Sequence, residues 1–312
     1  LYYNIADFSI WDYVGGLADI QARQLRLIGD VETRYREDPV RMLRAARLAA
    51  KLQFTIDPSA SEPFARLGHL LGDAPPARLF DETLKLFMAG YGLASFRMLE
   101  GRGLLKHLFA GTARALARDE HGALRSLIEA GLAGTDARVA QGKPVTPAFL
   151  FAVLLWGEVY ALARGMQSEG VERALAWQRS AHQVMAEQTA RVAIPRRFSY
   201  AMEEIWALQP RFAERSRKRV SRLLAHPRFR AAYDFMLLRA TESDDLRERG
   251  EWWTRVQTLG QEALAAELSK PAAAPEQAPA PGDEPAAPRK RRRRRGGRGR
   301  RSKAASSPDE GS

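Results

Sequence analysis

The chain has 312 residues, of which 49 are lysine or arginine and 37 are aspartate or glutamate, so its formal net charge is +12. It contains no cysteine, which excludes a disulfide scaffold, a thiolate-bound metal and a cysteine nucleophile. The length allows about two domains, and the basic excess favours a polyanionic partner, nucleic acid ahead of an anionic membrane.

The first thirty residues have the pattern of the last part of a small α/β unit. Aromatic and β-branched side chains predict extended segments, and paired glycines predict a turn. In chain order the pattern predicts strands at residues 2–5 and 8–13, a turn at Gly15-Gly16, a short helix over residues 17–23 and a third strand over residues 25–28.

Helix signals dominate the remainder of the sequence, and strand signals cease. Asp38-Pro39 predicts a helix start, with Asp38 as the N-cap and Pro39 at the first helical position. Pro75-Pro76 predicts another start. Apolar periodicity predicts further helices over residues 94–109, 112–132, 147–164, 170–190, 198–208, 211–225, 228–240 and 251–268.

The longest apolar run, residues 148–163, is interrupted by Gly157 and Glu158. A bilayer span needs about 20 apolar residues. The run therefore predicts a buried core helix, and no membrane span is expected.

Common catalytic motifs are absent from the sequence. The five histidines include no pair three or four residues apart, and there is no P-loop, G-x-G-x-x-G or G-x-S-x-G motif. Adjacent carboxylates such as Asp81 and Glu82 diverge by about 100° on a helix, so a solvated helix face is the favoured interpretation for them. No metal site is predicted.

The densest polar cluster runs from Arg34 to Arg47. Arg41, Arg44 and Arg47 are spaced three apart and share one side of a helix, and Asp38 lies one turn before Arg41. A carboxylate beside rigid guanidinium donors at a helix start has the chemistry to read the edge of a base or to hold a phosphate. From spacing alone, an N-capping aspartate paired with arginines on an exposed face remains the alternative.

Residues 2–19, 26–30 and 35–47 together resemble the second half of the head and the start of the neck in the class II nucleotidyltransferases. This family comprises the tRNA CCA-adding enzymes and the bacterial poly(A) polymerases. In the family, the E-D-x-x-R segment lies against the base of the incoming nucleotide, and a second arginine belongs to the same surface. The resemblance therefore implies a nucleotide-binding set of Glu37, Asp38, Arg41 and Arg44.

Later segments resemble the bacterial poly(A) polymerases more than the CCA-adding enzymes. They are Ala77–Glu82, Ile194–Phe198, Ile205–Gln209 with Arg211, His226–Asp234, Trp252-Trp253 and the arginine-rich end of the chain. The resemblance implies template-independent transfer of AMP from ATP to RNA 3′-ends, in cytoplasmic mRNA polyadenylation, RNA processing and decay. RNA is the implied partner, DNA is not expected, and no protein partner is predicted.

The sequence departs from the family at its front. The family's metal-binding carboxylates follow an early Gly-Ser, and they would precede Leu1. They serve phosphoryl transfer that uses two Mg²⁺ ions. We expect an N-terminally truncated polymerase whose catalytic residues and Mg²⁺ ligands lie upstream of Leu1, and which is inactive alone. The alternatives are a tRNA CCA-adding enzyme and a non-catalytic RNA-binding pseudoenzyme.

The resemblance and the composition divide the chain into four parts. The expected fold is mostly α, with the C-terminal remnant of an α/β head before an all-helical neck and body and a disordered basic tail. The expected boundaries are residues 1–35 for the head remnant, 36–110 for the neck with nucleotide-base and RNA binding, 111–268 for the RNA-binding body and 269–312 for the tail.

A basic stretch in the body is the predicted RNA-binding surface. Between Arg211 and Arg230 there are eight basic residues and a single acidic residue, Glu214. On one continuous helix, four of them would form a stripe able to follow a phosphate backbone, namely Arg211, Arg215, Lys218 and Arg222. An ordinary solvated helix face is the alternative. Trp206, Trp252 and Trp253 have the chemistry to stack on bases, but adjacent tryptophans point to different faces, so at least one of them is expected in the core.

Residues 271–312 carry +6 of the net charge, concentrated between Arg289 and Arg301, and their Ala, Pro, Glu and Gly content predicts disorder. Non-specific RNA attachment is the favoured interpretation, and a passive solubilising tail is the alternative.

Deleting residues 286–303 is expected to weaken RNA affinity and to flatten its salt dependence, because fewer counterions are released when fewer cations meet phosphates. The measurement is the slope of log affinity against log salt for a single-stranded RNA. An unchanged slope would show that this segment does not contact RNA.

Overall fold

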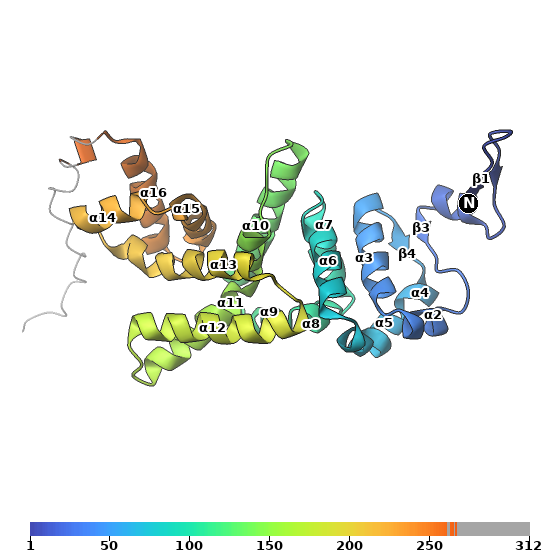
Figure 1. Cartoon of the computed structure of the whole chain (residues 1–312), viewed down its shortest axis with the longest axis horizontal. Helices are drawn as coiled ribbons and strands as arrows, with labels where there is room; N and C mark the ends of the chain where they lie inside the picture. The colour runs from blue at the N-terminus through green and yellow to red at the C-terminus, as the bar shows by residue number, and fades with distance from the viewer. Residues whose placement is uncertain (261–262, 265, 267–312) are drawn as a thin grey trace, which may run out of the picture. The chain divides into compact units, whose positions relative to one another are not determined.

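The computed structural model describes residues 1–260, 263–264 and 266. These residues belong to a compact unit that runs from Leu1 to Lys270, whereas the second unit, Pro271–Ser312, lies outside them. The prediction of a disordered tail over residues 269–312 therefore also lies outside the described residues. The described part is mostly helical with four two-residue strands, which confirms the predicted fold class (Figure 1).

The front of the chain contains the predicted strands in shortened form. β1 (Tyr2–Tyr3) pairs antiparallel with β2 (Ile10–Trp11). The turn that follows requires a positive φ, which Gly15 supplies at +78°. The Asp12 carboxylate accepts hydrogen bonds from the N–H groups of Gly16 at 2.9 Å and Leu17 at 2.8 Å, where α1 (Gly16–Gln21) begins. These bonds lower the pKa of Asp12 to about 2.

One strand lies where the sequence predicts only helices. β3 (Gln24–Leu25) pairs in parallel with β4 (Thr55–Ile56), held by the Thr55 N–H to the Arg23 carbonyl and the Asp57 N–H to the Leu25 carbonyl, both at 2.9 Å. The expectation that strands end before residue 30 is therefore wrong. A two-residue strand is too short to show an alternating pattern, and its partner lies about thirty residues earlier.

The helix between residues 30 and 38 was not predicted. α2 (Val31–Glu37) begins at Asp30, whose carboxylate accepts the N–H of Thr33 at 2.9 Å as an N-cap. Asp30 directly after Gly29 is a sequence signal for this helix start, and it follows the strand predicted over residues 25–28. The next elements are α3 (Val40–Leu52), α4 (Pro58–Ser61), α5 (Pro63–Leu67), the 3₁₀ helix η1 (Gly68–Asp73) and α6 (Pro76–Phe87).

Two predicted helices are each divided by a glycine with a positive φ. The segment 94–109 forms α7 (Gly92–Gly101) and α8 (Leu105–Leu108), with Gly103 at φ +69° between them. The segment 112–132 forms α9 (Ala110–Ala117) and α10 (Ala123–Ala140), with Gly122 at φ +69°. A left-handed conformation at these positions ends a helix that apolar spacing alone would continue.

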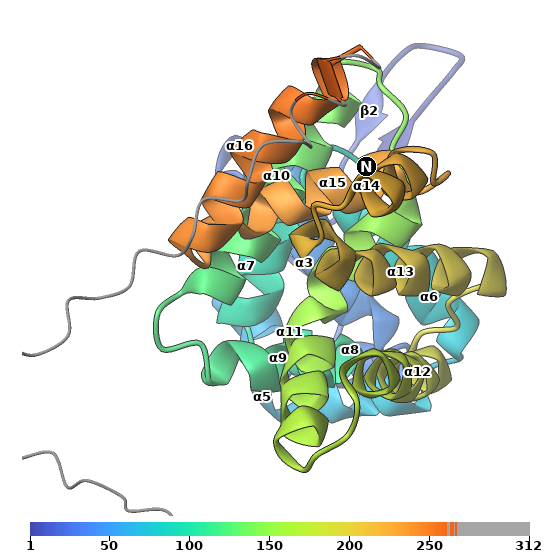
Figure 2. The same ribbon diagram turned by 90° about the vertical axis from the view of Figure 1, so that its left-hand side faces the viewer.

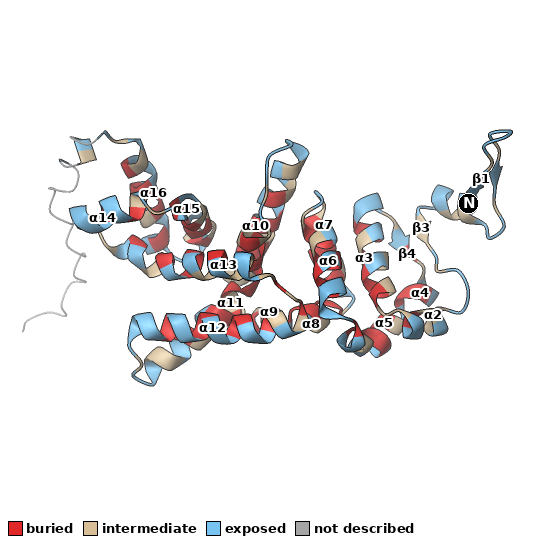
Figure 3. Ribbon diagram, in the orientation of Figure 1, coloured by how far each residue is buried: buried red, intermediate tan, exposed pale blue. Residues whose placement is uncertain are grey.

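The largest helix, α11 (Pro147–Ser168), lies in the core. It packs against α9, α10, α12 (Arg173–Arg191) and α13 (Arg196–Leu208), and its buried side chains include Phe151 and Trp156. Its length and composition would allow a membrane span, but 56% of its most apolar window is buried within the fold. This packing agrees with the predicted core helix (Figure 3).

The last described helices enclose a second, smaller core. η2 (Gln209–Ala213), α14 (Arg217–Leu224), α15 (Phe229–Leu238), η3 (Arg239–Thr241) and α16 (Asp244–Thr258) surround it. Figure 2 shows α10, α15 and α16 side by side. Trp206, Trp252 and Trp253 are 1%, 6% and 0% exposed, so the burial expected for at least one of them extends to all three, and none is available to stack on a base.

Arg239 links the two cores. Its guanidinium lies 4.4 Å from the centroid of the Trp156 ring in the main core, and Nη2 is 2.7 Å from Glu242 Oε2. Nη1 donates to Gln209 Oε1 at 3.4 Å, at the start of the second core. Since the Arg239 side chain is only 10% exposed, its charge depends on these contacts.

Arg239→Ala is expected to lower the free energy of unfolding by about 2–4 kcal/mol, because it removes a buried cation–π contact and leaves Glu242 without its partner. Urea denaturation measures this change. The control is Arg247→Ala, since Arg247 is 64% exposed and pairs with Asp244 at the surface. An equal and small effect of both substitutions would contradict a linking role for Arg239.

Candidate nucleotide-binding site

The site begins at the junction of α2 and α3. Asp38 has an extended backbone, with φ −146° and ψ 92°, and Pro39 is already helical with φ −59°. Asp38 Oδ1 accepts the N–H of Val40 at 3.2 Å, and the Asp38 carbonyl accepts the N–H of Arg41 at 3.0 Å. The predicted helix start at Asp38-Pro39 is confirmed, with regular helix beginning at Val40.

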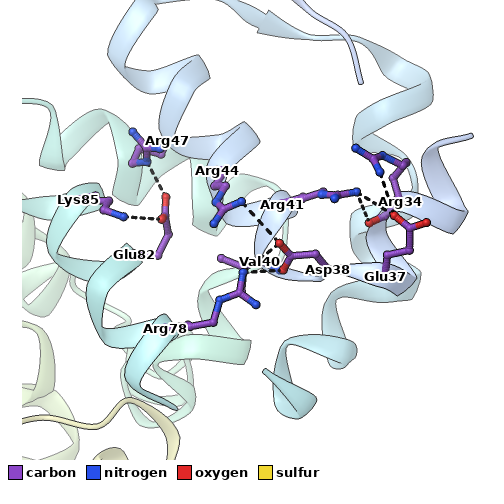
Figure 4. A network of polar contacts seen from close by, with 10 residues as sticks. All are labelled: Arg34, Glu37, Asp38, Val40, Arg41, Arg44, Arg47, Arg78, Glu82 and Lys85. Carbon is purple, nitrogen blue, oxygen red and sulfur yellow. Dashed lines mark hydrogen bonds and ion pairs between the residues drawn. The ribbon is translucent and has the colours of Figure 1, made fainter. Parts of the chain in front are cut away.

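The Asp38 carboxylate also holds two arginines from different helices. Arg78 of α6 donates through Nη2 to Oδ1 at 3.1 Å and to Oδ2 at 3.0 Å (Figure 4). Arg44 of α3 lies 3.6 Å from Oδ2 through Nη1. A carboxylate has about four acceptor positions, and the Val40 N–H and the two arginines use them. The carboxylate is only 17% exposed, whereas both guanidiniums are 45% exposed.

Arg41 is held by a separate group of atoms. Its Nη1 donates to Glu37 Oε2 and to the Arg34 carbonyl, both at 3.2 Å, and Arg34 Nη1 donates to the same Glu37 oxygen at 3.0 Å. All the hydrogen bonds that the Arg41 side chain makes to described residues use Nη1, so its Nε and Nη2 remain available as donors. Glu37 therefore orients Arg41 without using its whole donor fork.

The predicted set of Glu37, Asp38, Arg41 and Arg44 thus comes together on one edge of α3, in two ion-paired groups. The expected pairing of Asp38 with Arg41 does not occur, because Arg41 turns toward Glu37. The surface presents guanidinium donors, while the acceptor atoms of Asp38 are occupied.

A buried ion pair fixes α3 to α6 below this edge. Arg47 Nε lies 2.6 Å from Glu82 Oε1, and Lys85 Nζ lies 3.6 Å from Oε2. Burial opposes the charge of Arg47, but the hydrogen bonds that Arg47 makes to Glu82 and Tyr91 outweigh it and raise its pKa. Glu82 is 2% exposed, so the interpretation of Asp81-Glu82 as a solvated pair is wrong for Glu82.

Glu32 on α2 is held by two arginines at the edge of the same region. Arg66 of α5 lies 2.6 Å from its Oε2 and Arg36 lies 2.7 Å from its Oε1. Hydrogen bonds from Arg66 and then Arg36 lower the pKa of Glu32 to about 2. These pairs join α2 to α5.

The residues that sequence spacing missed are those contributed by α6. Arg78 and Glu82 are about forty residues from Asp38 and Arg47 in the chain, and no local period connects them. Ala77–Glu82 was noted only for its resemblance to the polymerases. Among the described residues, no group of three or more His, Asp or Glu side chains is arranged to hold a metal ion.

The second predicted set does not form one stripe. Arg211 lies in η2, the chain is extended at Glu214 (ψ 121°) and Ser216 (ψ 140°), and only Lys218 and Arg222 share α14. The continuous helix over residues 211–225 is therefore wrong. Phe212, completely buried in the second core, anchors η2 and requires the chain to turn before α14 starts.

Arg215 is occupied by contacts within the protein. It lies 3.3 Å from Glu248, and its guanidinium lies 5.2 Å from the centroid of the Trp252 ring. The exposed cations of α14 lie instead on one short helix, whose Val220 and Leu223 face the core; they are Arg217, Lys218, Arg219 and Arg222. Arg219 pairs with Glu214 at 3.1 Å.

Two family models match this sequence. The model described as "Polymerase A arginine-rich C-terminus" matches residues 169–298, and the model described as "Probable RNA and SrmB- binding site of polymerase A" matches residues 53–116. The second match includes α6, which supplies Arg78 and Glu82.

Relatives named poly(A) polymerase I align with most of the chain. The protein from Escherichia coli O157:H7 is 43% identical over 260 residues, which is 82% of this chain and 56% of the relative. The protein from Haemophilus influenzae is 38% identical, over 82% of this chain and 57% of the relative. The chain thus spans little more than half the length of these relatives.

More distant similarity extends to tRNA enzymes. A CCA-adding enzyme from Bacillus subtilis is 38% identical over 95 residues, which is 30% of this chain and 23% of that enzyme. A solved structure titled "tRNA-processing enzyme (apo form 2)" has the same fold, with a TM-score of 0.53 at 18% identity, over 86% of this chain and 71% of that one.

Glu82→Ala is expected to lower the free energy of unfolding by about 2–4 kcal/mol, because it leaves Arg47 partly buried without its carboxylate. Chemical denaturation measures the change. Asp81→Ala is the matched control, since Asp81 is the exposed neighbour on the same helix. If both substitutions cost the same small amount, α3 and α6 are not joined through this pair.

Proposed function

Because the chain belongs to the bacterial poly(A) polymerase family, within the class II nucleotidyltransferases, we propose that the protein that contains this chain transfers AMP from ATP to RNA 3′-ends and releases pyrophosphate. The observation that supports this most directly is the arginine edge of α3, where Asp38 and Glu37 orient Arg44 and Arg41 at the segment that resembles the family's base-binding motif. We propose mRNA polyadenylation in the cytoplasm as the setting, since ATP and RNA 3′-ends meet there.

In this proposal the base of ATP lies against Arg41, Arg44 and the carboxylates that hold them. Guanidinium groups carry only donors, so they match the ring-nitrogen acceptors of a base, and their flat faces stack on a purine. Asp38 acts as a positioning residue, since its acceptor atoms are taken by Val40, Arg44 and Arg78. Preorganised donors lose little freedom when the base binds.

Arg78 and Glu82 connect the arginine edge of α3 to the neighbouring helix α6. The Asp38–Arg78 and Arg47–Glu82 pairs connect α3 to α6 at two points along α3. A shift of α6 would therefore move the donors that face the base.

The described residues do not fit Mg²⁺, the ion expected for phosphoryl transfer, because no cluster of metal-ligating side chains occurs among them. No step of the proposed reaction is assigned to a metal here. We propose that the described residues contribute to the reaction by binding the nucleotide and the RNA.

RNA is proposed to contact three parts of the chain. They are the segment that matches the RNA-binding family model, the exposed cations of α14, and the arginine-rich residues 289–301, which lie outside the described residues. Lys218 and Arg222 of α14 are proposed to bind RNA. Arg211 and Arg215 lie outside this helix and are proposed to contribute to the same RNA-binding surface. Loops and short helices that carry several cations track a flexible phosphate backbone.

A tRNA CCA-adding activity is the second candidate, favoured by the similarity to the Bacillus subtilis enzyme over 95 residues. The two activities differ in nucleotide choice. A protein that extends RNA with ATP alone supports polyadenylation, and incorporation of CTP before ATP supports the alternative.

Arg41→Ala is expected to lower kcat/KM for ATP by roughly 10- to 100-fold, the loss of about one guanidinium–base contact. The measurement is extension of an RNA oligonucleotide by the protein that contains this chain. Arg97→Ala is the control, since Arg97 is likewise paired with a glutamate, Glu129, at 2.6 Å, but lies on α7, away from the site. Equal values of kcat/KM for the two variants would remove Arg41 from the nucleotide site.

A further inference from the structure

A pocket of about 640 Å³ lies in the body of the protein, on elements other than those that carry the nucleotide site. It is formed by the C-terminal half of α10, the loop that leads into α11 with the first turn of α11, and α15 with the two residues before it. Helices α10 and α15 lie side by side in both Figure 1 and Figure 2. Its volume is within the range of roughly 300–1,000 Å³ usual for small-ligand sites.

The pocket has small residues where a flat ring would lie. Gly131, Gly134 and Ala231 contribute no long side chain, and an added Cβ at Gly134 would meet no atom within 4 Å. Phe149 lines the pocket with a half-buried ring, fixed at 6.4 Å from the ring of Phe235 in an edge-to-face contact. Such a surface has room for a base and an aromatic side chain beside it.

Three exposed arginines surround this apolar surface. Arg230 donates to Asp234 at 3.1 Å, and Arg228 donates to Glu204 at 3.0 Å. Arg138 instead donates to the carbonyl of Pro144, at 2.9 Å through Nη2 and 3.3 Å through Nε. The carbonyl is neutral, and no carboxylate among the described residues pairs with Arg138. The positive charge of Arg138 is therefore not balanced by a described residue.

Two other pockets have a different charge. One of about 340 Å³ includes Asp119 and Glu242 beside Arg118, and one of about 790 Å³ includes four glutamates beside Arg173 and Arg211. Only the pocket at Arg138, among these three, has more arginines than carboxylates in its lining. Its chemistry therefore selects a ligand with a ring and a negative charge, which is a nucleotide.

The neighbouring sequence indicates that the nucleotide belongs to an RNA chain. Helix α14, with its exposed cations, ends at Leu224, and Pro227 and Arg228 already line the pocket. A strand of RNA that lies along α14 would thus be near the pocket where the helix ends.

We propose that this pocket binds one nucleotide of single-stranded RNA, with the base on the surface formed by Gly134 and Phe149 and a phosphate at Arg138. The proposal rests on the proposed function only in taking RNA as the substrate. The pocket holds an upstream part of the RNA and takes no part in the chemistry at the 3′-end.

The first test fills the pocket without changing any charge. Gly134→Leu in the full chain is expected to lower the affinity for a short oligo(A) about tenfold, the usual loss of one stacked base. Gly165→Leu is the matched control, because Gly165 is also an exposed helical glycine whose added Cβ meets no atom within 4 Å. Both variants should unfold at or above the wild-type temperature, since each replaces a helical glycine.

The second test removes the unpaired charge. Arg138→Ala is expected to reduce the slope of log affinity against log salt by about 0.7, the value for one phosphate contact on a single strand. Arg164→Ala, an exposed arginine on α11, is the control for general charge loss. Cross-linking of an oligo(A) that carries 8-azidoadenosine should label the peptide with Phe149, which separates this pocket from binding by residues 289–301.

Several results would overturn the proposal. Wild-type affinity in Gly134→Leu, an equal loss in Gly165→Leu, or equal slopes for Arg138→Ala and Arg164→Ala would each show that no nucleotide enters the pocket. Displacement of the cross-link by AMP at concentrations well below those of competing oligo(A) would identify a free-nucleotide site instead. A wild-type chain that binds no RNA would contradict the proposed function itself, whereas wild-type binding with unaffected variants contradicts only this inference.

Discussion

The carboxylate of Asp38 is the interaction on which the nucleotide-binding edge depends. This side chain accepts one hydrogen bond from the Val40 N–H at the start of α3 and two from Arg78 of α6. It also forms an ion pair with Arg44. The Asp38 carboxylate therefore caps a helix, connects two helices and orients a surface arginine. Removing any of these partners would leave a carboxylate that is only 17% exposed with unmet acceptors.

Features that depend on neighbours in the sequence could be predicted from it. The helix start at Asp38-Pro39, the turn at Gly15 and the core position of α11 follow from capping, backbone and apolar patterns. Features that depend on distant contacts could not. Thr55–Ile56 is a strand only because Gln24–Leu25 lies beside it, and Glu82 is buried only because Arg47 meets it across two helices.

The prediction of a basic stripe on one helix over residues 211–225 was wrong for a related reason. Charge spacing describes a surface only if the chain is one helix, and a buried residue can interrupt that helix without changing the spacing. Phe212 of η2 takes part in the second core, the chain is extended at Glu214 and Ser216 between η2 and α14, and Arg215 contacts Glu248 and Trp252. The basic character of the region remains, but its geometry comes from the core and not from a helical period.

A double-mutant cycle between Asp38 and Arg78, read as the apparent affinity for ATP, tests the central claim most directly. If Asp38 positions the arginines through its bond to α6, Asp38→Ala and Arg78→Ala each weaken ATP binding, and the double variant loses less than their sum. The account predicts a coupling of at least about 1 kcal/mol. Additive effects, within about 0.3–0.5 kcal/mol, would show that the two residues act independently and would contradict it.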